Sequence, residues 1–166
     1  MKLTISQEDL SNGLQSVHNI VSSRTTLPIL SNVLLSAKDN KLELTATDLD
    51  LTISRSVEAK VIEQGEYTLP VKKLFGLARA TGSSQIEMDV RAGHCKIQSG
   101  SFSTKLNGLP AEEFPPKPEI KGRTRVRISQ EKLRQLLKRT AYAVSADENR
   151  YVLNGIFVRI EEKMLT

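Results

Sequence analysis

Apolar residues in two parts of the chain recur at the spacing of a helix. After Ser6, a preferred N-cap residue, four of them follow at intervals of three or four positions: Leu10, Leu14, Val17 and Val21. This spacing predicts an amphipathic helix over 7–22. A second helix is predicted to begin at Pro70 and to continue until Gly82, with a buried face formed by Leu74, Leu77 and Ala78.

Elsewhere apolar and polar residues alternate, as they do in half-buried strands. Strands are predicted over 2–5, 29–37, 41–47, 51–61, 65–69, 85–91, 95–99 and 103–106. A hairpin turn is expected between Lys38 and Lys41. Two helices and about eight strands in this order predict an α+β fold, in which the helices pack on one side of antiparallel sheet.

Part of this pattern occurs twice. The segment Ile5-Ser-Gln-Glu-Asp-Leu10 returns as Ile128-Ser-Gln-Glu-Lys-Leu133, at an offset of 123 residues and with five of six positions identical. The same offset, without a gap, places Leu30 over Leu153. Because self-similarity at a fixed period is typical of repeated structural units, we expect a first domain of roughly 120 residues and a second copy that ends early. The last residue of the chain is equivalent to Glu43.

The excess positive charge lies after residue 120. Residues 1–120 hold 13 Lys and Arg against 14 Asp and Glu, a net charge of −1, whereas residues 121–166 hold 11 against five, a net charge of +6. Four prolines fall within 109–118 just before this change, which predicts an extended linker. We therefore expect one domain at 1–118 and the incomplete start of its repeat at 119–166.

The composition is that of a globular protein, with 39% hydrophobic and 26% charged residues. No apolar run reaches the length of a membrane span, and the first residues lack the apolar core of a signal peptide, so the expected location is the cytoplasm. The single cysteine excludes an intramolecular disulfide and a cysteine-only zinc site.

Residues with catalytic or metal-binding chemistry are few. Asp48 and Asp50 would share one face of an extended chain, but the sequence offers no third ligand nearby, and a polar connection between strands is favoured. Cys95 lies in an alternating run typical of a core position. For His18, beside an apolar stripe, and His94, at a turn, structural or solvent-exposed roles are favoured. The sequence motifs of nucleotide loops, hydrolase nucleophiles and zinc sites are absent, so we expect no catalytic residue, metal or cofactor.

Basic residues on the repeated helix are more informative. Arg134 and Lys138 are four positions apart and Arg139 adjoins them, which predicts a basic stripe. Their counterparts in the first copy are polar but uncharged: Ser11, Gln15 and Ser16. A helix face without carboxylates can lie against a phosphate backbone, and such contacts carry no sequence preference. Only 4% of the residues are aromatic, so contact with duplex DNA fits better than stacking on single strands.

Several segments, in the same order along the whole chain, resemble the bacterial sliding clamp, the beta subunit of the DNA polymerase III holoenzyme. They are Arg24-Thr-Thr-Leu-Pro-Ile-Leu30, Leu42–Leu49, Leu69-Pro-Val-Lys-Lys-Leu-Phe75, Leu109-Pro-Ala-Glu-Glu-Phe-Pro115 and Asp147–Gly155. The resemblance implies the DNA-clamp fold, tandem repeats of two helices packed on antiparallel sheets, with the second repeat truncated here. It also implies a parent protein of three such domains, which forms a homodimeric ring around duplex DNA.

The resemblance further implies a non-catalytic processivity factor that tethers the replicative polymerase. The implied partners of the full-length protein are sequence-independent duplex DNA, the catalytic subunit of DNA polymerase III and the clamp loader. By motif, the residues expected to bind DNA are Arg24, Lys72, Lys73, Arg134, Lys138, Arg139 and Arg150. Those expected at the dimer interface are Lys73, Ser103 and Leu106, and Leu153 is expected in the cleft for partner peptides.

The chain departs from the family pattern in two places. It ends at Thr166, just before a Thr-Asp-Gly motif of the second domain, and small hydroxyl residues stand at Ser101 and Ser103 where the family often has arginine. A stand-alone DNA- or protein-binding module that forms no ring therefore stays an alternative. A metal-dependent hydrolase that uses Asp48 and Asp50 is a weaker one.

Overall fold

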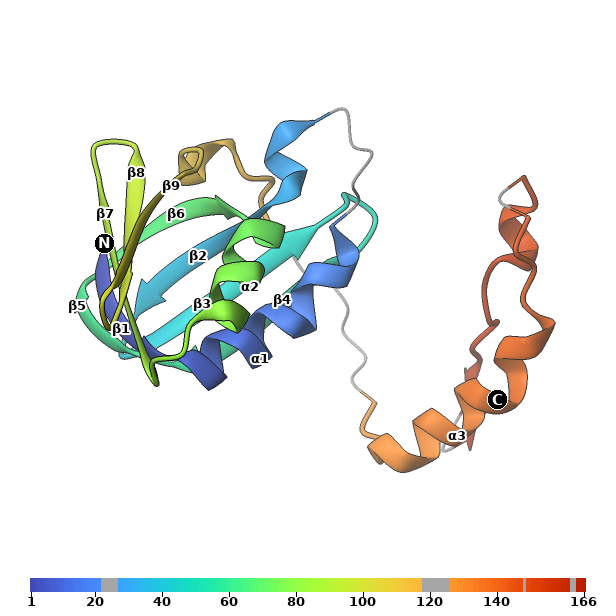
Figure 1. Ribbon diagram of the computed structural model, residues 1–166. Helices are drawn as coiled ribbons and strands as arrows, with labels where there is room; N and C mark the ends of the chain where they lie inside the picture. Colours follow the sequence, from blue (N-terminus) through green and yellow to red (C-terminus); the bar gives the residue numbers. More distant parts are fainter. Residues whose placement is uncertain (22–26, 118–125, 148, 162–163) are drawn as a thin grey trace. The chain divides into compact units, whose positions relative to one another are not determined.

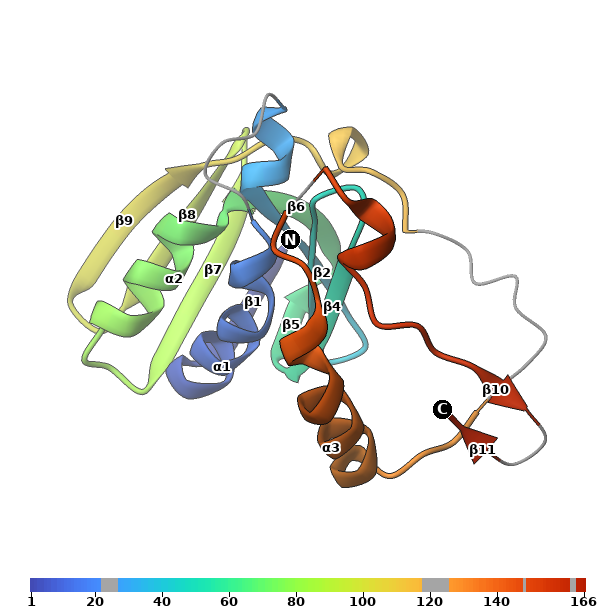
Figure 2. The same ribbon diagram turned by 90° about the vertical axis from the view of Figure 1, so that its right-hand side faces the viewer.

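The computed structural model describes residues 1–21, 27–117, 126–147, 149–161 and 164–166. They fall into two compact units, Met1–Pro118 (unit 1) and Glu119–Thr166 (unit 2). Unit 1 contains two antiparallel sheets and two helices that lie side by side against them, as both views show (Figures 1 and 2). The prediction of an α+β fold with antiparallel strands is confirmed, with two sheets in place of one.

The strands of unit 1 form one sheet of five and one of four. The five-stranded sheet has the order β5-β1-β7-β8-β9, and the four-stranded sheet has the order β4-β3-β2-β6. Their bounds are β1 Lys2–Ser6, β2 Asn32–Lys38, β3 Lys41–Thr47, β4 Thr52–Glu58, β5 Lys60–Glu63, β6 Gly65–Pro70, β7 Gln85–Arg91, β8 His94–Ser99 and β9 Phe102–Asn107. The helices are α1 Gln7–Val17 and α2 Val71–Ala80, and short 3-10 turns cover His18–Ile20, Pro28–Ser31 and Ala111–Glu113.

The main core lies between the two helices and the two sheets. α1 contributes its buried stripe of Leu10, Leu14 and Val17, and α2 contributes Val71, Leu74 and Ala78. Both sheets point apolar residues at these helices, among them the fully buried Leu3, Leu35, Leu44, Leu69 and Ile97. The predicted buried faces are confirmed except at Leu77, which is half-buried, and at Val21, which is buried but lies after the helix.

α1 begins where the sequence predicts and ends earlier. The backbone N–H of Asp9 donates to the Ser6 side-chain oxygen at 3.0 Å, and the Ser6 hydroxyl donates to the Asp9 carboxylate at 2.6 Å, so Ser6 is the N-cap. The predicted continuation to 22 is wrong, because the helix tightens into a 3-10 turn after Val17 and the chain is extended at Val21. Asn and β-branched residues in this stretch are weak helix formers.

Two predicted strands need correction. The strand expected over 29–37 begins at Asn32, because Pro28 opens a 3-10 turn that covers its first residues. The run over 51–61 is two strands in different sheets, since β4 pairs with β3 whereas β5 pairs with β1. The break falls at Ala59, which is buried and whose N–H donates to the carbonyl of Asn40 at 3.1 Å.

The predicted hairpin between β2 and β3 is confirmed. Asp39 and Asn40 both have positive φ, 51° and 55°, as a two-residue type I′ turn requires. Asp and Asn tolerate this conformation better than other residues with a side chain.

The segment predicted as an extended linker is partly folded onto unit 1. Leu109 pairs with Thr68 of β6, and Phe114 is only 7% exposed in a small apolar cluster with Ile29 and Leu30. The prolines exclude regular helix or strand, as expected, but they do not keep the segment away from the protein surface.

Unit 2 repeats the first elements of unit 1 at the predicted offset. Its helix α3, Gln130–Thr140, and the 3-10 turn Ala141–Ala143 lie 123 residues after α1 and its own 3-10 turn. The Lys132 N–H donates to the Ser129 side-chain oxygen at 3.3 Å, which confirms the predicted cap. The short strands β10 Ile160–Glu161 and β11 Met164–Leu165 pair in the register of β2 with β3. The predicted repeat is therefore confirmed from the helix onwards, whereas residues 126–129, the counterparts of 3–6 in β1, form no strand.

Candidate nucleic-acid interface

The first turn of α2 carries two exposed lysines, Lys72 and Lys73. No acidic residue lies in this turn, and Pro70 at the N-cap has no capping side chain to offer. Cations at the N-terminus of a helix oppose the helix dipole, typically by about 0.3–1 kcal/mol each. Their placement therefore works against the local stability of α2 and favours a role in binding an anion.

Arg79 extends the basic surface of α2 and is a residue that the sequence analysis missed. It lies seven positions after Lys72, which places both on one side of the helix, with the exposed Gly76 between them. The Arg79 guanidinium lies 5.7 Å from the centre of the Phe75 ring, and the Phe75 ring lies 4.6 Å from that of His18. The seven-residue spacing was the signal that could have found it.

The adjoining surface of α1 is polar and carries no charge beyond its first turn. Asn12, Gln15 and Ser16 are exposed, and Ser11 is half-buried. α1 packs against α2, and the Gln7 side chain donates to the Ala78 carbonyl at 2.6 Å. The acidic first turn of α1 therefore lies at the Arg79 end of α2, and the uncharged remainder of α1 runs towards the Lys72 end. Acidic residues on α1 are confined to Glu8 and Asp9 in the first turn.

The predicted basic stripe on α3 is shorter than expected. Arg134 and Lys138 line a shallow apolar depression together with Leu133 and Leu137. Arg139 does not line this depression, because successive residues are about 100° apart around a helix. The structure thus brings two of the three predicted residues together.

Of two further residues predicted to contact DNA, the structure describes Arg150 but not Arg24. Arg150 is exposed, and its guanidinium lies 3.4 Å from the Asp147 carboxylate, so part of its charge is offset. Arg24 lies outside the described residues.

The residues predicted at the dimer interface come from two elements. Ser103 and Leu106 both lie on β9, an edge strand of the five-stranded sheet, whereas Lys73 lies on α2. An odd spacing along a strand puts Ser103 and Leu106 on opposite faces, and Leu106 packs against the core. Phe102, on the same face of β9 as Leu106, is 43% exposed. This large exposed aromatic residue at an open sheet edge is a candidate interface residue that sequence analysis missed.

Leu153, predicted to receive partner peptides, lies in the 3-10 turn Tyr151–Leu153 of unit 2 and is 52% exposed. Val152 beside it is 92% exposed. Their repeat counterparts in unit 1, Ile29 and Leu30, are buried under Phe114. The second copy therefore presents an apolar pair that the first copy covers.

Asp48 and Asp50 lie in a turn and not on the extended chain that a metal site would have needed. One carboxylate oxygen of Asp48 accepts the N–H groups of Asp50 and Leu51 at 3.1 and 2.7 Å, and Leu49 has a φ of 84°. This geometry is the polar turn between strands that the sequence favoured. Within the described ranges, no group of three or more His, Cys, Asp or Glu residues could hold a metal ion.

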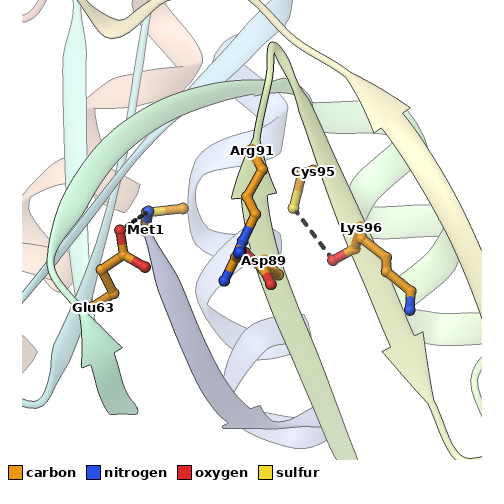
Figure 3. Close-up of polar contacts among 6 residues, drawn as sticks. All are labelled: Met1, Glu63, Asp89, Arg91, Cys95 and Lys96. Carbon is orange, nitrogen blue, oxygen red and sulfur yellow. Dashed lines mark hydrogen bonds and ion pairs between the residues drawn. The ribbon is translucent and has the colours of Figure 1, made fainter.

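Cys95 is a core residue, as predicted. Its side chain is fully buried and its thiol points at the carbonyl of Lys96 at 3.8 Å (Figure 3). Burial raises the pKa of the Cys95 thiol to about 12, which keeps it neutral and unreactive at physiological pH. The charges nearby are paired, with Arg91 2.9 Å from Asp89 and the N-terminal ammonium 3.5 Å from Glu63 (Figure 3).

The chain resembles one protein family over most of its length. The family described as "DNA polymerase III beta subunit, N-terminal domain" matches residues 1–118. The chain belongs to the DNA polymerase III beta subunit family. A beta sliding clamp of Chlamydia muridarum is 35% identical over 167 residues, covering 100% of this chain and 46% of the relative. One of Pseudomonas aeruginosa is 37% identical over 163 residues, covering 96% and 44%.

Solved beta subunits have the same fold. The Caulobacter crescentus polymerase III beta structure matches with a TM-score of 0.92 and 34% identity, covering 98% of this chain and 44% of the other. The sliding clamp of Bartonella birtlesii, solved bound to griselimycin, matches with a TM-score of 0.93 and 34% identity, covering 99% and 45%. The chain thus spans less than half the length of these family members.

None of the helices in the described ranges is long and apolar enough to cross a membrane.

Proposed function

We propose that this chain functions as part of a DNA sliding clamp, a non-catalytic accessory subunit of DNA polymerase III in the cytoplasm. The observation that carries the proposal is the basic helix surface of a beta-subunit fold: Lys72, Lys73 and Arg79 are exposed on α2, whose first turn has no acidic residue. In the homodimeric ring of a full-length clamp, this surface would contact the phosphate backbone of the encircled duplex.

The contact is expected to be weak and blind to sequence. Lysine and arginine on a helix face reach phosphate oxygens, which are the same at every base pair. On unit 2 the proposed contacts are Arg134, Lys138, Arg139 and Arg150, and Arg24 is proposed from its motif alone. Lys72 and Lys73 fit this function best, because in the first turn of α2 they cost helix stability and gain only when a phosphate lies near.

Protein contacts are proposed at two other surfaces. Lys73, Ser103 and Leu106, to which we add Phe102, would form the first-domain side of the ring's dimer interface on and near the open edge of β9. Leu153 would receive peptides of partners, namely the polymerase catalytic subunit and the clamp loader. Residues 119–166 are proposed as the start of the second clamp domain, following a first domain at 1–118.

Duplex binding at several salt concentrations tests the proposed DNA surface. In a variant with Lys72→Ala and Lys73→Ala, the affinity for duplex DNA should fall at low salt. The slope of log K against log salt should become shallower by about 0.9 for each phosphate that the variant no longer neutralises. The fall should be the same for duplexes of different sequence, because the contacts are to the backbone.

A matched control removes two lysines from the other side of unit 1. Lys96 and Lys105 are exposed, face each other across β8 and β9, and alternate with core residues, so they point away from the helices. The variant with Lys96→Ala and Lys105→Ala has the same net charge as the α2 variant but should keep the affinity and the salt slope. If both variants bind equally weakly, binding follows net charge alone and the proposed surface is wrong.

A further inference from the structure

The segment after β9 lies along the edge of the four-stranded sheet. Residues 107–117, hereafter the strap, start at the last residue of β9 and meet β6 at Leu109. The outer edge of β6 is not paired with another named strand (Figure 1). The Thr68 N–H donates to the carbonyl of Leu109 at 3.2 Å, and the Leu109 N–H donates to the Thr68 hydroxyl oxygen at 3.1 Å. The strap therefore meets the edge of β6 at one isolated bridge, made by one main-chain hydrogen bond and by the Thr68 hydroxyl group.

A glycine makes this close approach sterically feasible. A Cβ at position 108 would lie 1.7 Å from the carbonyl oxygen of Thr68 and 2.7 Å from a ring carbon of Tyr67. The Gly108 N–H donates to the Tyr67 hydroxyl at 3.1 Å. Any side chain at this position would push the start of the strap away from β6.

The rest of the strap is held by one aromatic anchor and one ion pair. Phe114 packs with Ile29 and Leu30 in a cluster that is separate from the main core, with Leu34 at its margin. At the end of the strap, the Lys117 ammonium lies 2.6 Å from the Glu43 carboxylate of β3. Both of these side chains are exposed, so the ion pair adds little.

Sheet-edge domains recognise extended peptides through main-chain hydrogen bonds together with side-chain pockets, and the strap has one such hydrogen bond, at Leu109, and one side-chain anchor, Phe114. We propose that the surface under the strap is a peptide-binding groove that the chain fills with its own residues. This surface, the β6 groove, is formed by Ile29, Leu30, Leu34 and Thr68. The occupant it fits is an extended peptide with glycine and leucine beside Thr68 and a phenylalanine five positions after the leucine.

The covalent link explains why the groove is closed in the unaltered chain. A tethered segment acts at an effective concentration on the order of millimolar, so a free peptide of similar affinity competes poorly. Loosening the strap without changing the groove should therefore open it. The inference does not depend on DNA binding, because none of the groove residues lies on α1, α2 or α3.

Peptide binding to the full chain tests the groove. The probe is a fluorescein-labelled peptide with the sequence of residues 107–117, followed by fluorescence anisotropy. Gly108→Ala and Phe114→Ala each loosen the strap and leave the groove residues unchanged. Gly82→Ala is the matched control, since a Cβ there meets nothing within 4 Å. We expect the two strap variants to bind the peptide at least about tenfold more tightly than the unaltered chain or the Gly82→Ala variant.

Two results would overturn the proposal. In the first, both strap variants unfold as cooperatively as the unaltered chain but bind the peptide no better than Gly82→Ala. In the second, both variants lose cooperative unfolding of unit 1, which would show that the strap is part of the core. A peptide with alanine at the position of Phe114 should bind neither variant, and equal binding of that peptide would also contradict the groove.

Discussion

Single side chains differ in whether their charge is available to a ligand. Asp89 lies beside Arg91 and raises the pKa of its guanidinium, and Asp147 lies beside Arg150. Lys72 and Lys73 share a helix turn that contains no acidic residue. The net charge of +5 could be read from the sequence, as could the shared face of Asp89 and Arg91 on the strand predicted over 85–91. The 2.9 Å contact between these two side chains could not.

The thiol of Cys95 offers a residue-scale prediction. An ordinary thiol in the unfolded chain ionises at a lower pH than the buried one, whose pKa is raised to about 12. The folded state therefore holds its proton as the pH rises, and the stability that this burial supplies is complete at neutral pH and is lost as the pH climbs towards 12. Relative to Cys95→Ala, the unaltered chain should lose about 1–2 kcal/mol of unfolding free energy between pH 7 and pH 10.

Urea unfolding of both chains at the two pH values measures this difference. Lysine and tyrosine residues titrate alike in both chains, so their contribution drops out when the two unfolding free energies are subtracted. A difference between the two chains that stays constant with pH would contradict the burial of the thiol.

At the scale of elements, local patterns define the helices and most strands, and long-range packing defines the rest. The capping serines and the leucine spacing predict α1 and α3 because both signals lie within a few residues. The change of sheet at Ala59 leaves no local signal, because apolar and polar residues keep alternating through it. The packing of the strap on unit 1 also leaves no local signal. Its prolines indicate that it forms neither regular helix nor strand, but nothing near Phe114 in the sequence indicates that this side chain packs against Ile29 and Leu30.

One of the packing positions at which the two copies of the repeated helix differ is Gly13. Gly13 of α1 lets the helix approach the four-stranded sheet so closely that a Cβ would lie 2.6 Å from a methyl group of Leu44 and 3.1 Å from one of Val57. The repeat places Leu136 at the equivalent position of α3, where it is 40% exposed. The second copy of the helix therefore cannot pack as closely as α1 does.

Transferring that residue tests the packing of α1. Gly13→Leu should lower the unfolding free energy of unit 1 by about 1–3 kcal/mol, because overpacking outweighs the gain of roughly 1 kcal/mol in helix propensity. Chemical unfolding followed by circular dichroism measures the change. Gly76→Leu, on the exposed side of α2 where a Cβ meets nothing within 4 Å, is the control and should not destabilise the protein. Equal stability of the two variants would contradict the close packing of α1.

At the scale of the whole molecule, the two units differ in how much apolar surface they bury. Unit 1 has a continuous core of fully buried side chains, whereas α3 has no buried residue and exposes Leu133, Leu136 and Leu137 by about two fifths each. The sequence predicted this division from the repeat and from the charge step after residue 120. Segments with few buried contacts open at low free-energy cost.

Limited trypsin digestion should therefore cut unit 2 first. Cleavage after the basic residues of α3 should precede cleavage after Arg55 and Arg79, which are exposed but lie on elements packed in unit 1. Mass spectrometry should show a product that contains unit 1 accumulating early. Protection of 126–161 equal to that of unit 1 would contradict the difference in packing.

We propose that this chain carries the DNA-facing surface of a clamp within less than half the length of its relatives. The most direct measurement is its residence time on a nicked circular duplex and on the same duplex linearised, at low and at physiological salt. We expect salt-sensitive binding with equal residence on both forms, because backbone contacts hold the chain and no closed ring does. A residence on circles that linearisation abolishes, or no duplex binding at low salt, would contradict the account.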